Sequence, residues 1–321
     1  MQKIKKHKAT VLICVVAVIL VIGLWLKRLP ENYAYMFLGN YDGTEDAIDA
    51  ISCLKLTDDE AEAMNENLEE YDDFRQQNLE VKLSFTGANN DEMSAYYYNQ
   101  NSEVTVVLLG SFTEDKDSDY IFASYYYDKG YNILIPDMRN EGESEGEYVS
   151  WGDLESEDLV NELNQLSEMY GEKSYIIHGK LIGASTALLA MKNMPDNVMF
   201  IVAEEAYPSF DELASEFVSN ILRIPSIIGM PLFKAACNNI FGIDITAIDI
   251  CDGITQDIPV LLVYAENDEI ISENMIQELE NALGDAGETL EIEGARYKNF
   301  ESVGKDKIES HIDSYITEYF K

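Results

Sequence analysis

Five residues, Gly179-Lys-Leu-Ile-Gly183, stand where this sequence could do chemistry, between a short apolar strand and an apolar helix. The strand is expected at 174–178 and the helix at 184–191, so the glycines make a tight turn. In the pattern G-x-S-x-G, such a turn presents a serine nucleophile at its middle position. Here the middle residue is Leu181, which has no proton to lose and no lone pair. The sequence therefore predicts the frame of a nucleophilic site without its nucleophile.

The elements around this turn predict an α/β fold. Strands near 79–85 and 93–98 form a hairpin. Continuous apolar runs, typical of parallel strands covered on both faces, follow at 104–109, 131–135, 175–177, 198–203 and 259–264, and a last short strand is expected at 290–292. Helices are expected near 118–129, 153–170, 183–193, 273–283 and 305–320. This alternation predicts a mostly parallel, doubly wound sheet.

One segment, 207–257, breaks the alternation of strands and helices. It holds two apolar helical stretches, near 210–222 and 230–241, between consecutive strands. An insertion at this point predicts a helical lid over the carboxyl ends of the strands.

The N-terminal thirty residues differ in composition from the rest. A basic segment, 1–8, precedes the uncharged apolar run 9–26, whose eighteen residues would cover about 27 Å as a helix. The excess of lysine before the run predicts a single-pass signal-anchor in the cell membrane, with a cytoplasmic N-terminus and an extracellular C-terminal domain. A cleaved signal peptide and an internal helix are the alternatives, although no small-x-small cleavage site follows. Residues 27–78 are expected as a juxtamembrane segment that carries an acidic helix from Thr57 to about Gln77.

The charge of the chain excludes some partners. Six of the 22 Lys and Arg lie in the first thirty residues, so the rest carries 16 of them against 60 Asp and Glu, a net formal charge of −44. Such a surface repels nucleic acid. Outside the apolar run, Cys53, Cys237 and Cys251 allow at most one disulfide, and without a C-x-x-C pair no zinc or redox site is indicated. We expect no metal and no cofactor.

One block adds a family resemblance to this fold prediction. Residues 131–146 carry Asp137, Arg139, Gly142, Ser144 and Gly146 at the spacing of P-D-x-R-x-x-G-x-S-x-G. This block resembles the α/β-hydrolase superfamily, of the serine aminopeptidase S33 and monoglyceride lipase-like kind, and in particular its membrane-anchored bacterial members. The resemblance covers about residues 79–320, so the hydrolase-like domain is placed at 79–321.

The resemblance implies a degenerate catalytic triad. In the family, serine, acid and histidine follow one another along the chain. The matching positions in this sequence hold Leu181, Asp268 and Tyr297, so only the acid remains. Backbone N–H groups near Ser111 or Phe112, together with that of Ile182, match the oxyanion hole. Gly179 and Gly183 still permit the tight turn.

Other polar residues near the turn have ordinary structural explanations. His178 is expected to pack beneath the turn, Ser185 to face away from the cleft, and Lys180 to reach solvent or an acid. Ser111 is better placed but lacks a partner base. Glu204 and Glu205 end a central strand, and an acidic cleft there would favour a cationic ligand.

These observations lead to one main hypothesis. The chain is expected to be a pseudoenzyme, a membrane-anchored α/β-hydrolase-fold protein that binds a small molecule or a protein in its cleft. The alternative is a hydrolase of non-standard mechanism that uses Asp268 with Ser111 or Glu204, and a purely structural envelope protein is a third possibility. Leu181 is expected at positive φ with its side chain in the former pocket. An open pocket would favour ligand binding, and a filled one would favour a protein-surface role.

Overall fold

The computed structural model describes residue 28 and residues 30–39, 58–112, 114–118, 120–171, 173–221, 223–297 and 299–319. The predicted span 9–26, Cys14 and Cys53 lie outside these ranges. Within them, no helix is both long and apolar enough to cross a bilayer.

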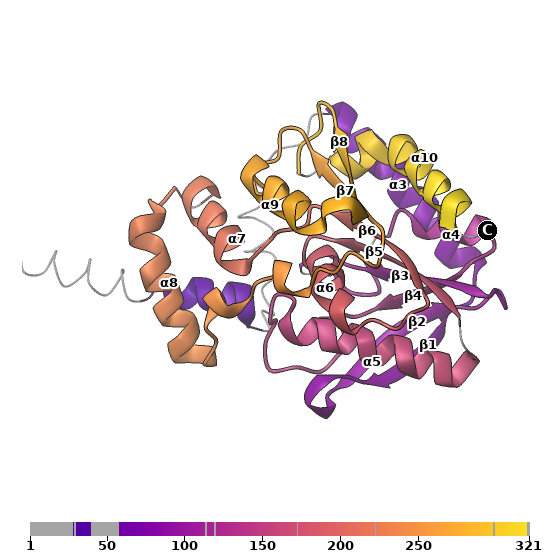
Figure 1. Cartoon of the computed structure of the whole chain (residues 1–321), viewed down its shortest axis with the longest axis horizontal. Helices are drawn as coiled ribbons and strands as arrows, with labels where there is room; N and C mark the ends of the chain where they lie inside the picture. The colour runs from indigo at the N-terminus through magenta and orange to yellow at the C-terminus, as the bar shows by residue number, and fades with distance from the viewer. Residues whose placement is uncertain are drawn as a thin grey trace, which may run out of the picture.

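One eight-stranded sheet forms the centre of the described chain (Figure 1). Its strands are β1 Val81–Thr86, β2 Glu92–Tyr98, β3 Val104–Leu109, β4 Asn132–Pro136, β5 Ser174–Lys180, β6 Val198–Glu204, β7 Val260–Ala265 and β8 Gly287–Ile292. Their order is β1-β2-β4-β3-β5-β6-β7-β8. The pairs β1–β2 and β2–β4 are antiparallel, and the others are parallel. The predicted mostly parallel sheet is confirmed.

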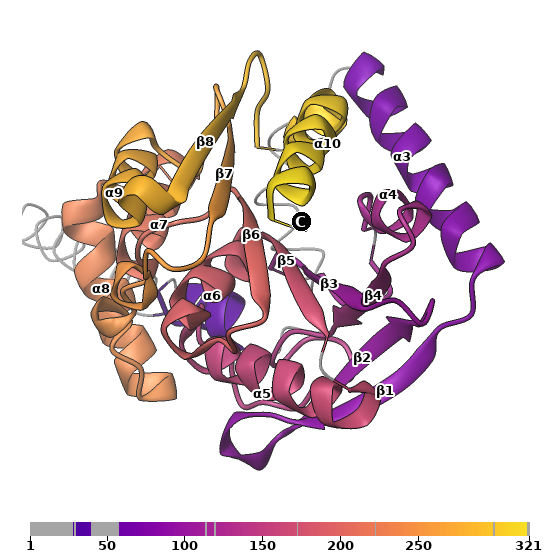
Figure 2. The same cartoon turned by 45° about the vertical axis from the view of Figure 1, so that its right-hand side comes forward.

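Helices cover both faces of the sheet (Figure 2). One layer contains α3 Asp58–Gln77, α4 Ala123–Asp128 and α10 Phe300–Tyr319, and the other contains α5 Asp153–Tyr170, α6 Ile182–Ala190 and α9 Glu273–Leu283. Alternate residues of each strand enter one of two cores, as Ile176 and Ile177 do on opposite faces of β5. The helix expected near 118–129 is shorter than predicted, because residues 120–122 form turns and the regular helix begins at Ala123.

Helix α3 lies on the domain and is buried along one side. Tyr71 and Phe74 are almost fully buried in the core that α4 and α10 share. The amide of Asn67 donates to the Ser302 hydroxyl of α10 at 3.3 Å. From residue 62 onward the acidic side chains of α3 are exposed, at positions 62, 66, 69, 70, 72 and 73.

The insertion 207–257 forms a helical cap beside the elbow. It contains α7 Phe210–Glu216, a π-helical turn Phe217–Ile221 and α8 Ser226–Phe241. Backbone hydrogen bonds from Phe210 N to Ile248 O and from Ile250 N to Pro208 O close its base. Both described cysteines of this region, Cys237 and Cys251, are free thiols.

The loop after β4 holds a buried ionic network. The Arg139 guanidinium binds both carboxylate oxygens of Asp158, with Nε–Oδ2 at 2.8 Å and Nη2–Oδ1 at 2.7 Å. Asp137, fully buried, pairs with Lys116. A Cβ at Gly142 would lie 2.5 Å from the Asp137 carboxyl group, so only glycine fits. The block that carries the family resemblance therefore anchors the loop beneath the cleft.

Candidate functional site

The tight turn between β5 and α6 has the backbone of a nucleophile elbow. Leu181 lies between the two elements with φ 49° and ψ −107°. A Cβ at Gly179 would stand 2.4 Å from the carbonyl carbon of Gly183, and one at Gly183 would stand 2.5 Å from the Leu109 oxygen. Both glycines are thus required by close backbone approach. A positive φ costs a leucine roughly 1–2 kcal/mol, which its surroundings must offset.

The Leu181 side chain points into an apolar cavity under the lid. Only 5% of its surface is exposed. Phe37, Phe112, Trp151 and Tyr297 line the same cavity, together with Met36, Leu213, Phe217 and Ile270. Its volume is about 30 Å³, which leaves room for about two water molecules. The cavity at the predicted nucleophile position is therefore nearly filled.

Phe37, one of the residues that line this cavity, comes from the segment expected to be juxtamembrane. Residues 30–38 form a helix whose last residues lie between the lid and the loop before α5. The Trp151 indole donates to the Phe37 carbonyl at 2.8 Å, and Val149 N donates to the Leu38 carbonyl at 2.9 Å. The Phe37 ring meets that of Phe217 edge to face at 4.8 Å. The chain thus occupies its own cleft.

Asp268, the acid of the predicted degenerate triad, pairs with another acid. Asp268 Oδ1 accepts the backbone N–H groups of Ile270 and Ile271, at 2.5 and 2.6 Å. Its carboxyl group also shares a hydrogen bond with that of Glu205, which is completely buried at φ 53°. Burial, followed by the neighbouring Asp268, raises the pKa of Glu205 well above its ordinary value. Glu205 is therefore the protonated donor and Asp268 the acceptor.

Tyr297, at the position predicted to match the family's histidine, is poorly suited to act as a base. It is half-buried beside the cavity, and burial raises the pKa of its hydroxyl group above its ordinary value. The phenol is therefore neutral near pH 7 and a poor base. Its hydroxyl bonds the side chain of Ser111. The hydrogen-bond partner of the Ser111 side chain is therefore a neutral phenol, which cannot act as a general base for it.

The oxyanion-hole positions are altered as well. The Ser111 N–H donates to Glu114 Oε2 at 2.7 Å. A carboxylate at this donor competes with a developing oxyanion and repels it. Phe112 directs its ring into the cavity, where it lies 5.0 Å from the Trp151 ring. Ile182 keeps its place as the first residue of α6.

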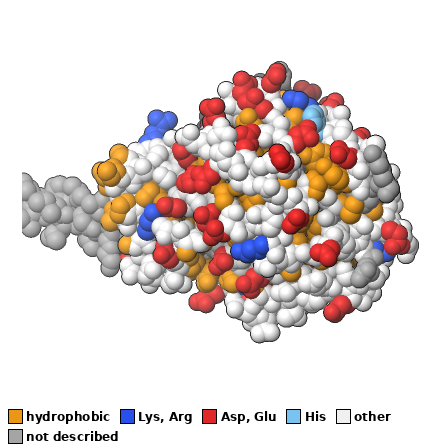
Figure 3. All heavy atoms as spheres, in the orientation of Figure 1, with side chains coloured by type: hydrophobic (Ala, Val, Ile, Leu, Met, Phe, Trp, Pro, Cys, Tyr) orange, Lys and Arg blue, Asp and Glu red, His pale blue; other side chains and the backbone are white. Residues whose placement is uncertain are grey.

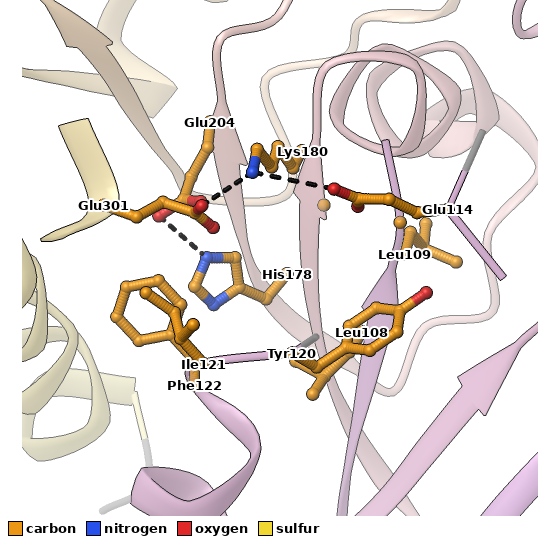
Figure 4. Close-up of a pocket in the computed structure, with 12 residues that line it drawn as sticks. Leu108, Leu109, Glu114, Tyr120, Ile121, Phe122, His178, Lys180, Glu204 and Glu301 are labelled. Carbon is orange, nitrogen blue, oxygen red and sulfur yellow. Dashed lines mark hydrogen bonds and ion pairs between the residues drawn. The ribbon is translucent and has the colours of Figure 1, made fainter. Parts of the chain in front are cut away.

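A second polar cluster, shown in Figure 4, lies on the face of the sheet that α4 and α10 cover, whereas Leu181 lies in the core of the other face. His178 Nε2 is 3.1 Å from Glu204 Oε1, and its Nδ1 is 3.1 Å from the Tyr126 hydroxyl. Lys180 Nζ lies 2.6 Å from Glu301 Oε2. Burial alone would lower the pKa of Lys180, but the carboxylates of Glu301 and Glu114 outweigh this effect and raise it.

These pairings separate Asp268 from Glu204, one of the two partners in the alternative catalytic set. Glu204 pairs with His178, whereas Asp268 pairs with Glu205. Because consecutive residues at the end of β6 point to opposite faces, one acidic site does not form. Ser185 is buried, and its hydroxyl accepts from Tyr207 N at 2.9 Å, as expected of a packing residue. No group of three or more His, Cys, Asp or Glu suited to a metal occurs in the described part of the chain.

Sequence reasoning missed three residues of the site: Phe37, Glu114 and Glu205 as the partner of Asp268. The apolar run Tyr33-Ala-Tyr-Met-Phe-Leu38 could have indicated that this segment is buried, because a solvent-exposed stalk would not carry so many consecutive apolar residues. Glu114 carries no sequence signal, because its contact depends on the shape of one loop.

Comparison with known proteins agrees with the observed fold. No family model matches the chain. It is 27% identical over 172 residues to the uncharacterised protein YqkD of Bacillus subtilis (strain 168); the match covers 52% of this chain and 56% of that protein. The Pyrococcus furiosus esterase Pf2001 superposes with a TM-score of 0.62 and 19% identity, over 76% of this chain and 94% of the esterase. A puromycin-hydrolysing peptidase of Mycobacterium tuberculosis superposes with a TM-score of 0.58 and 15% identity, over 75% of this chain and 39% of the peptidase. The chain therefore has the α/β-hydrolase fold.

Proposed function

We propose that this protein is a membrane-tethered pseudoenzyme that acts by binding a protein partner on its surface. The observation that carries the proposal is Leu181, which occupies the elbow with its side chain buried in the former pocket. Without a nucleophile at this point, no acyl-enzyme can form there. Removing the nucleophile or base from such a site costs about 10⁶ in turnover.

Three further features support a silent site. Asp268 is engaged by Glu205, the Ser111 N–H is engaged by Glu114, and Tyr297 is neutral. Each would oppose a different step of acyl transfer. Because Phe37 leaves a cavity of only about 30 Å³, the cleft offers no space to a drug-sized ligand. A surface role is thus favoured over small-molecule binding.

The proposed tether is the apolar run 9–26, with the acidic domain on the extracytoplasmic side. A domain held this way meets partners in the plane of the membrane, where even weak binding becomes effective.

A fluorophosphonate probe tests whether the site lacks a reactive serine nucleophile. The full-length chain in detergent is expected to stay unlabelled, while an active serine esterase added to the same sample is labelled. Labelling of the native chain that heat denaturation abolishes would refute the proposal. Resistance to alkaline extraction from membranes, together with protease sensitivity of the domain from outside intact cells, tests the tether and its orientation.

A further inference from the structure

Helix α8 has an apolar side that faces away from the domain. Ile227, Ile228 and Leu232 are 85%, 56% and 39% exposed. Pro231 and Ala235 are exposed on the same side. Because residues three and four apart share a side of a helix, these five residues form one continuous surface, which we call the α8 outer face. The inner side packs into the domain through Met230, Phe233, Ala236 and Cys237.

The charge around the α8 outer face differs from that of the remaining domain. The 27 residues of segment 217–243 contain no Asp or Glu, and Arg223 and Lys234 are their only Lys or Arg residues. The whole chain has 60 acidic residues. Figure 3 shows hydrophobic side chains at the end of the molecule where α8 lies and in a second area toward the opposite end, with acidic side chains spread over this view. Segment 217–243 thus adds no acidic side chain that an anionic surface would repel, although Asp211 of α7 pairs with Lys234 at 2.7 Å.

The chain emerges from the proposed tether at this same end. The helix of residues 30–38 packs on the inner side of α8, with the Phe37 and Phe233 rings 5.7 Å apart. Tyr35 meets Phe241 at 5.4 Å near the end of α8. The apolar run ends four residues before Pro30, and four residues span at most about 14 Å however they run. The bilayer surface thus lies within reach of α8.

From these observations we infer that the α8 outer face docks on the lipid bilayer that holds the tether, an inference that rests on the proposed tether. Lipid accepts isoleucine and leucine at its interface without a complementary protein surface. The exposed Arg223 can reach anionic head groups, and the missing acids remove the repulsion felt elsewhere on the domain. Docking would fix the orientation of the domain, with the lid on the membrane.

Quenching by brominated lipid tests this contact in the full-length chain. We would place the protein, one chain per nanodisc, in phosphatidylcholine and phosphatidylglycerol with or without brominated acyl chains. Ile228→Trp in a Trp25→Phe background reports on the α8 outer face, while the buried Trp151 is common to all samples. Met169→Trp, which is 47% exposed in the last turn of α5, is the matched control.

Brominated acyl chains are expected to quench about half of the fluorescence of the tryptophan introduced at position 228. This extent corresponds to a ring buried at the depth of an interfacial helix. The tryptophan at position 169 should be unaffected, and adding Ile227→Glu and Leu232→Glu should abolish quenching at position 228. Equal fluorescence at position 228 in both lipids, from a chain that still resists alkaline extraction, would overturn the docking inference alone. Loss of the chain from the nanodisc would instead refute the tether.

Discussion

The carboxyl groups of Glu205 and Asp268 share one hydrogen bond, in which the protonated Glu205 donates. In a working triad the acid would orient a histidine. Here it accepts from a second acid, next to a neutral Tyr297. In this structure Asp268 therefore makes a structural contact whose strength depends on pH.

Glu205→Gln should make stability less dependent on pH. The folded-state pKa of Glu205 is raised, so its stabilising contribution is complete below the ordinary value of 4.5 and is lost as pH rises through the raised value. Glutamine still donates to Asp268 but does not titrate. We expect the variant to gain on the order of 1 kcal/mol over wild type near pH 8, measured by urea unfolding. The exposed Glu293→Gln is the control. If the free energies of unfolding of wild type and Glu205→Gln changed equally with pH, Glu205 would not be the protonated donor to Asp268.

Phe37→Ala should destabilise the domain although residue 37 precedes the sheet. The ring is 95% buried among aromatic side chains, and truncating such a phenylalanine costs about 3–5 kcal/mol. Tyr35→Ala on the same helix removes a side chain that is 49% exposed and should cost about 1 kcal/mol or less. Similar losses in the two variants would mean that this helix does not fill the cleft.

Placing serine and histidine at the two predicted triad positions should not produce catalysis. We expect Leu181→Ser with Tyr297→His to hydrolyse p-nitrophenyl acetate at the background rate, because Glu114 holds the Ser111 N–H. Adding Glu114→Ala should raise the rate on the order of 10²-fold, the usual worth of one oxyanion donor.

Glu301→Ala is the matched control for that series, since it removes a carboxylate from Lys180 without freeing Ser111 N–H. A double variant that already turns over well above background would show that the oxyanion donor is available despite Glu114.

Arg139→Met should be strongly destabilising. The change leaves the carboxylates of Asp158 and Asp91 without their cation, and breaking a buried pair this way costs about 3–5 kcal/mol. Lys82→Met removes an exposed ion pair with Glu143 and should cost about 1 kcal/mol or less. Denaturant unfolding compares the two variants. A small decrease in the free energy of unfolding for Arg139→Met would mean that the network contributes little to stability.

Local patterns predicted those parts of the molecule that depend on neighbours in sequence. The run of residues 104–109 coincides with β3, and α5 and α9 have their predicted limits. The elbow was predictable because its two glycines and Leu181 lie within five residues. The loop before α4 was not, since turns at residues 120–122 shorten the helix.

Contacts between distant residues escaped prediction. Phe37 and Trp151 lie 114 residues apart, and nothing in either segment alone indicates that they meet. The pairing of Glu205 with Asp268 likewise depends on how β6 and β7 lie side by side. Adjacent acids in the sequence suggested one acidic cleft, whereas the strand separates Glu204 from Glu205.

The bond between Asn67 of α3 and Ser302 of α10 joins residues 235 positions apart. During synthesis, the partner surface on α10 leaves the ribosome long after α3 does. Until then Tyr71 and Phe74 have only part of their final cover, and the nascent chain exposes aromatic surface that invites aggregation. Efficient production of this protein should therefore depend on chaperones that shield its early segments until translation ends.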